Sequence, residues 1–291
     1  MTRIAQIIKG MPATDGAGVE LNRIIGQPAL SMLDPFLLLD VFRSDNPDDY
    51  IAGFPPHPHR GFETVTYLLE GRMRHKDNAG HEGIIESGGI QWMSAGKGIV
   101  HSEMPEQENG LLEGFQLWVN LPAEHKMNAP QYQEFSSKQI PVEMREGNTE
   151  VRVITGKTSK GTQGPVTQPL TDPLYLDVKL PPGSSFSEPL NPEYNAFVYI
   201  IQGPITIGDN HTRLTRDQLA VLIPGDQVII RSMQEDVRFL LVTGKPLKEP
   251  VARGGPFVMN TREEIDQAFA DYKGARIQLA SATGGLIPKN T

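Results

Sequence analysis

The feature that most constrains the fold is a series of short apolar or alternating runs, each closed by a turn signal. Between Gly53 and Pro122 they include Thr64 to Leu69 before a Glu-Gly pair and Ile90 to Ser94 before an Ala-Gly pair. The 29 glycines and 24 prolines suit such turns and disfavour long helices. The pattern therefore predicts an all-β protein, built as a barrel or sandwich.

A second series of runs, from about residue 174 to 243, follows the same order. When AFVYIIQGPITIGDN is set under ETVTYLLEGRMRHKDNAG, Gly203 falls on Gly71. We interpret this as a tandem duplication of one β-module. The predicted domains are residues 1–135 and residues 136–291.

The tail of the sequence has a different pattern. Thr261 and Glu264 form a capping-box pair, and apolar residues follow at helical spacing from Ile265 to Tyr272. Gly274 stands where a helix would end. We expect one short amphipathic helix over residues 261–273, packed on the barrels.

Charge and composition exclude several classes of protein. The net charge is −8 and no segment concentrates lysine and arginine, so direct nucleic-acid binding is not expected. The absence of cysteine leaves only nitrogen and oxygen as metal ligands. The sequence shows neither a secretory signal nor an apolar run long enough for a bilayer, so we expect a cytoplasmic protein without membrane contact.

Two short motifs carry the chemistry. His57 and His59 form an HxH pair, and His101 and Glu103 form an HxE pair. Residues i and i+2 of a strand point to the same face, so two adjacent strands would bring all four side chains together. An isolated HxH is usually a surface or structural feature, but the ordered combination with HxE predicts one metal centre.

This donor set restricts the metal. Neutral imidazoles with one carboxylate suit Fe(II), and equally Mn, Co, Ni, Cu or Zn, better than Mg or Ca. In octahedral geometry four protein ligands leave two positions open. Substrate, water or dioxygen could bind there.

Other polar residues are expected to have ordinary roles. His75 and His81 flank a predicted turn, and His125 and His211 lie in or beside polar loops, so all four are expected at the surface. Gln116 lies on a strand near the ligands. We expect it to pack in the core or, alternatively, to donate a hydrogen bond to a ligand carboxylate or to substrate.

Four stretches resemble the pirin family of the cupin superfamily: HPHRGFETVTYLLEG, GGIQWMSAGKGIVHSEMP, FQLWVNLP and EPVARGGPFVMNTREEI. The resemblance implies two tandem cupin barrels, which are jelly-roll-like double-stranded β-helices, with one iron in the N-terminal barrel. It also implies His57, His59, His101 and Glu103 as ligands. Glu63 matches the glutamate of the general cupin motif, but the pirin pattern uses the later carboxylate. We expect Glu63 to support the ligands or pack in the core, with direct ligation as the lesser alternative.

The second module can be compared with the first by counting from its glycines. Pro189 and Asn191 fall at the positions of His57 and His59. The positions of His101 and Glu103 fall on one of two pairs, Ile230 with Ser232 or, after a shift of one residue, Ile229 with Arg231. Neither alignment retains a ligand set, so the C-terminal barrel is expected to bind no metal.

The resemblance implies quercetin 2,3-dioxygenase activity, with an aromatic or enol substrate and dioxygen as the small-molecule partners. Glu103 would then be both a ligand and the base for the flavonol hydroxyl. The alternative that the resemblance implies is a metal-dependent, redox-sensing regulatory protein that binds a transcription factor or a metabolic enzyme. An isomerase on the same barrel is a third reading, because fold and metal do not fix the substrate.

Overall fold

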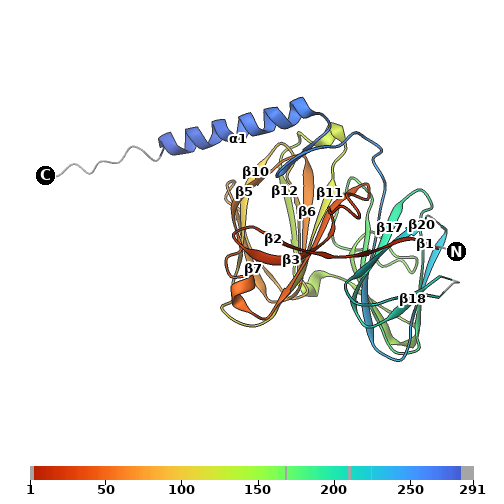
Figure 1. Cartoon of the computed structure of the whole chain (residues 1–291). Helices are drawn as coiled ribbons and strands as arrows, with labels where there is room; N and C mark the ends of the chain where they lie inside the picture. Colours follow the sequence, from red (N-terminus) through yellow and green to blue (C-terminus); the bar gives the residue numbers. More distant parts are fainter. Residues whose placement is uncertain (1–2, 168, 209–210, 224, 283–291) are drawn as a thin grey trace.

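The chain forms two β-barrels side by side, with a helix at one end of the first barrel (Figure 1). The computed structural model describes residues 3–167, 169–208, 211–223 and 225–282. None of the helices in these ranges has both the length and the apolar character needed to cross a membrane. The predicted all-β class is confirmed.

The first barrel contains eleven strands. They are β2 (Met11–Asp15), β3 (Val19–Ile25), β4 (Phe36–Ser44), β5 (Phe54–His59), β6 (Phe62–Glu70), β7 (Arg72–Asp77), β8 (Glu82–Glu86), β9 (Ile90–Ser94), β10 (Ile99–Pro105), β11 (Leu112–Asn120) and β12 (Gln131–Phe135). Two antiparallel sheets face each other, in the orders β12-β9-β6-β11-β4-β3-β2 and β5-β10-β7-β8. Short 3-10 helices lie at Pro47–Asp49 (η1), Ala123–His125 (η2), Ser137–Gln139 (η3) and Glu146–Asn148 (η4).

The second barrel repeats this plan. Its strands are β13 (Val142–Arg145), β14 (Thr149–Thr155), β15 (Leu174–Leu180), β16 (Ser185–Pro189), β17 (Asn195–Gln202), β18 (Ile205–Ile207), β19 (Thr212–Leu214), β20 (Gln218–Ile223), β21 (Gln227–Ser232) and β22 (Val237–Gly244), joined by β1 (Arg3–Lys9). The sheet orders are β1-β20-β17-β22-β15-β14-β13 and β16-β21-β18-β19. Strand β1 thus extends the sheet of the second barrel, where Arg3 pairs with Ile223. The boundary between residues 135 and 136 stays a prediction.

A large apolar cluster lies between the two barrels. One face of each seven-stranded sheet contributes to a single cluster, in which the Phe115 ring of β11 lies 5.5 Å from the Tyr199 ring of β17. A buried polar contact lies in the same interface, because the Tyr67 hydroxyl donates to Asp177 at 2.5 Å and Arg238 pairs with Asp177 at 2.6 Å. The buried charges are therefore compensated.

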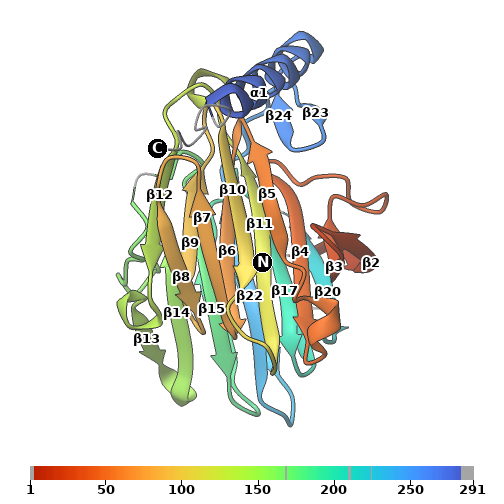
Figure 2. The same ribbon diagram turned by 90° about the vertical axis from the view of Figure 1, so that its left-hand side faces the viewer.

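A C-terminal unit covers one end of the first barrel (Figures 1 and 2). It consists of the hairpin β23 (Ala252–Gly254) and β24 (Phe257–Met259), followed by α1 (Arg262–Ala282). The predicted capping box is confirmed, since the Glu264 amide donates to the Thr261 hydroxyl at 3.2 Å. The predicted end at Gly274 is wrong, because the helix continues through it. Apart from its chain neighbours and the backbone of the helix, no atom of the described residues lies within 4 Å of where its Cβ would be, and an exposed helical glycine costs only about 1 kcal/mol.

Candidate metal centre

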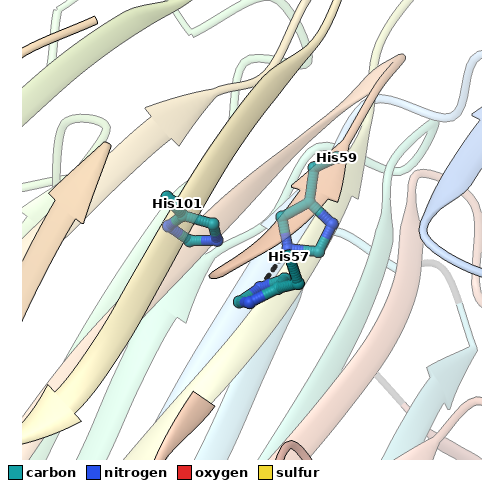
Figure 3. A group of neighbouring side chains, drawn as sticks. All are labelled: His57, His59 and His101. Carbon is teal, nitrogen blue, oxygen red and sulfur yellow. Dashed lines mark hydrogen bonds between the residues drawn. The ribbon is translucent and has the colours of Figure 1, made fainter. Parts of the chain in front are cut away.

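Strands β5 and β10 are adjacent and antiparallel, and they bring three histidines together. His101 on β10 is the direct partner of His57 on β5, and His59 follows two residues later on the same face. One ring nitrogen from each histidine falls in a group whose members all lie within 4.8 Å of one another. Figure 3 shows the three rings converging between the two strands.

The three rings bring their nitrogen atoms close together, with few hydrogen-bond partners among the described residues. The Nδ1 of His57 lies 2.9 Å from the carbonyl oxygen of Pro55 and can donate to it, which leaves Nε2 unprotonated. That Nε2 lies only 3.0 Å from Nε2 of His59. Both ring nitrogens of His101 are buried without a hydrogen-bond partner among the described residues. A cation held between the rings would be bound by one nitrogen of each ring.

The protonation state of the rings also fits a metal. Burial lowers the pKa of His59 and His101 well below the usual range, and the neighbouring imidazoles lower the pKa of each further. Both rings are therefore neutral at pH 7. Neutral imidazole is the form that binds transition metals.

Glu103 is buried two residues beyond His101, but it lies outside the three-histidine group. The register between β5 and β10 shifts between these two residues, so Glu103 pairs with Phe54. Its Oε2 accepts from the Gln116 amide at 3.0 Å, and its Oε1 accepts from the Thr66 hydroxyl at 2.9 Å. Among the described residues neither lysine nor arginine pairs with this carboxylate, so a bound cation would compensate its charge.

A cavity of about 610 Å³ opens onto this group. His57, His59 and Glu103 line it together with Thr66 and Gln116. Its remaining wall is largely apolar and includes Leu21, Leu38, Phe42, Phe54, Met73 and Trp118. The volume is that of a pocket for a small organic molecule.

Comparisons with known proteins agree with this architecture. The Pirin family model matches residues 18–119, and the model of the Pirin C-terminal cupin domain matches residues 175–278. A pirin-like protein of Caulobacter vibrioides is 54% identical over 275 residues, which cover 94% of this chain and 98% of the relative. The chain belongs to the pirin family. The expected pair of tandem cupin barrels is therefore confirmed.

Two solved structures extend the comparison with the pirin fold. A quercetin 2,3-dioxygenase from Acinetobacter baumannii is 33% identical, with a TM-score of 0.86 over 95% of this chain and 98% of that chain. A bacterial pirin from Escherichia coli, solved in complex with nickel(II), is 20% identical, with a TM-score of 0.63 over 84% of this chain and 99% of its own. The second likeness shows a shared fold.

Glu63 of this pirin lies away from the metal group. The pairing of β6 with β9 is regular from Glu63 to Tyr67, so Glu63 and Thr66 point to opposite faces of the sheet, and Thr66 contacts Glu103. Direct ligation by Glu63, the lesser alternative, is therefore wrong. Burial raises the pKa of Glu63 to about 7, although hydrogen bonds from the side chains of Trp92 and Ser94 lower it in part.

The expectations for the other polar residues have mixed outcomes. His75 is buried and not at the surface, because the inward face of β7 carries Met73, His75 and Asp77, and His75 lies opposite Glu103. His81 is exposed as expected. The alternative expected for Gln116, donation to the carboxylate of Glu103, is present.

The register of the second barrel differs from the one inferred by counting residues. In the first barrel His101 pairs with His57, and Ile99 pairs with His59. The corresponding pairs of the second barrel are Val228 on β21 with Glu188 on β16, and Asp226 with Leu190, whose amide donates to the Asp226 carbonyl. The pairing with β18 places Ile230 at the position of Glu103. The positions of His57 and His59 therefore fall on Glu188 and Leu190, one residue before the inferred Pro189 and Asn191. The positions of His101 and Glu103 fall on Val228 and Ile230, one residue before the inferred Ile229 and Arg231 and two residues before the other inferred pair, Ile230 and Ser232. The prediction that this barrel binds no metal stays a prediction.

Sequence reasoning missed one buried cation beside the site. Lys126 is almost fully buried, and its ammonium donates to the carbonyl oxygens of Gly61 and Val258 at 2.6 and 3.1 Å and to Asn120 at 2.6 Å. Burial lowers the pKa of Lys126 to about 8. The lysine connects the turn after His59 to strand β24. A lysine in a polar loop gives no sequence signal for such a role.

Proposed function

We propose that this pirin is an iron-dependent dioxygenase that cleaves flavonol-like substrates. The observation that carries the proposal is a cluster of three imidazoles near a buried, uncompensated carboxylate, where that carboxylate and two of the imidazoles line a cavity of about 610 Å³. The similarity to a structure named as a quercetin 2,3-dioxygenase supports the same activity. The cytoplasmic location stays a prediction.

In this proposal His57, His59, His101 and Glu103 hold the metal. The nickel(II) complex of the Escherichia coli pirin supports a transition metal, and Mn, Co, Cu or Zn would suit the same nitrogen and oxygen donors. Iron would supply Lewis-acid and redox chemistry toward an enol and dioxygen. Two of the imidazoles are held neutral by burial, which favours metal binding at neutral pH.

The protein side chains would prepare the substrate. Glu103 accepts the proton of the enolic hydroxyl, while hydrogen bonds from Thr66 and Gln116 fix the orientation of its carboxylate. Apolar walls, including Leu38 and Trp118, contact the planar rings and exclude water from the reacting carbon atoms. The products expected from a flavonol are a ring-opened ester and carbon monoxide.

The test is anaerobic reconstitution with Fe(II), followed by addition of flavonol and air. We expect flavonol absorbance to fall with release of carbon monoxide. His101→Ala should lose most of its metal and this activity, because one of few ligands is removed. His125→Ala removes a histidine of the same barrel outside the group and should retain both. Full metal occupancy in His101→Ala would contradict the assigned site.

The regulatory alternative makes a different prediction. A redox-sensing protein would bind Fe(II) at the same residues and retain a partner protein without consuming flavonol or oxygen. An isomerase would form product without oxygen uptake. Metal binding without oxygen consumption would therefore favour these alternatives over the dioxygenase.

A further inference from the structure

The mouth of the cavity carries a guanidinium group that has no carboxylate partner among the described residues. Arg253 on β23 lines the same cavity as His57, His59 and Glu103. Its Nη1 donates to the carbonyl oxygen of Leu37 at 3.1 Å, and its guanidinium carbon lies 5.9 Å from the centre of the Trp118 ring. The remaining donors of this side chain are available to a ligand.

The second arginine of the cavity, Arg23, has carboxylate partners. Arg23 binds both oxygens of Asp40, at 2.9 and 2.7 Å, and Asp15 at 3.0 Å. Its charge is therefore compensated within the wall. Burial lowers the pKa of Arg253, and repulsion from the positive charge of Arg23 lowers this pKa further. An anion at this point would relieve the repulsion and pair with the free donors.

The position of Arg253 is fixed by the C-terminal unit. The amide of Val258 on β24 donates to the carbonyl of Arg60, and the ammonium of Lys126 donates to the carbonyl of Val258. Phe257 packs on α1, where its ring lies 5.0 Å from the ring of Phe269. The hairpin that carries Arg253 is thus attached to the turn that follows His59.

We propose that Arg253 selects substrates with a carboxylate at the end remote from the metal, so that the substrate class is an acidic flavonol or a related aromatic enol acid. This inference rests on the proposed function, because it takes the enol end to be held at the three histidines. The enol oxygen would lie at the metal group and the carboxylate at the guanidinium of Arg253. Trp118 would contact the rings, because its own ring lies 5.3 Å from the His59 ring and 5.9 Å from the guanidinium carbon of Arg253.

The test compares two ligands that differ only in charge. We would measure the dissociation constants of 3-hydroxyflavone bearing a carboxylate or a carboxamide on its phenyl ring, as the 3′ and 4′ isomers, on the Fe(II)-loaded protein without oxygen. Charge-assisted hydrogen bonds at a partly exposed site predict about fivefold tighter binding of one acid isomer than of its amide. Arg253→Gln should abolish this preference. Arg213→Gln removes an exposed arginine of the second barrel and should retain it.

The outcomes separate this inference from the proposed activity. Equal affinities in the unaltered protein, an unchanged preference in Arg253→Gln, or no binding of either ligand would overturn the role of Arg253. Turnover in air is measured separately. Cleavage of both ligands without a preference would retain the dioxygenase and reject the inference, whereas a preference without cleavage would retain the inference and reject the dioxygenase.

Discussion

The buried carboxyl of Glu63 makes the stability of the protein depend on pH in a specific direction. Burial raises its pKa from the ordinary 4.5 to about 7, so folding favours the protonated form. The stabilisation from protonation is fully present below pH 4.5 and is lost as the pH rises through 7. The complete loss is about 3.5 kcal/mol, at about 1.4 kcal/mol for each pH unit between the two pKa values.

Glu63→Gln removes this titration and keeps the shape of the side chain. The free energy of unfolding of the variant, relative to the unaltered protein, should rise by about 2.5 kcal/mol between pH 5 and pH 8. The assay is urea unfolding of the metal-free proteins at both pH values. Glu20→Gln, at an exposed position of β3, is the control and should show no such change. A difference that is equal at the two pH values, or larger at pH 5, would refute the reasoning.

Two further predictions concern the surroundings of the metal group. Gln116→Leu removes the amide that donates to Glu103 and should weaken metal binding by about tenfold to a hundredfold, as measured by competition with a chelator. The control variant Gln131→Leu, at an exposed position of β12, should bind metal as the unaltered protein does. Equal metal affinities in the two variants would contradict a supporting role for Gln116. Lys126→Met removes the ammonium that donates to three buried oxygen atoms, of which Asn120 Oδ1 keeps the Leu121 amide as a donor, and should lower the free energy of unfolding by about 3 kcal/mol in denaturant titration. The exposed Lys138→Met should change it little, and a loss below about 1 kcal/mol in Lys126→Met would argue against the lysine as a connection.

Local patterns predicted the parts of this molecule that depend on neighbouring residues. The two-residue spacing within HPH and HSE was sufficient to predict the cluster of His57, His59 and His101, because strand alternation fixes which side chains share a face. The capping box of α1 was predicted because Thr261 and Glu264 are only three residues apart in the sequence. The direct role of Glu103 as a ligand stays a proposal, since a register shift separates it from the histidine group.

Long-range packing could not be predicted in this way. The sequence around His75 resembles an exposed hairpin, and only the pairing of β7 with β10 shows that its ring faces inward. Counting from glycines also misplaced the equivalent positions of the second barrel, because the connections differ in length. Leu37 is the hydrogen-bond partner of Arg253 and Val258 is one of the partners of Lys126, and each lies more than 100 residues away in the sequence, where one sequence gives no signal.

The pairing of β1 with β20 affects how the chain must assemble. Arg3 meets Ile223 across more than 200 intervening residues, so β1 is synthesised before all the other described strands and waits for a late partner. Contacts so distant in sequence slow folding, because the long intervening loop must close first. A protein cut between the two barrels would leave β1 without its partner and β20 with an open edge, which favours aggregation. The two halves should therefore be recovered in better yield when they are produced as one chain.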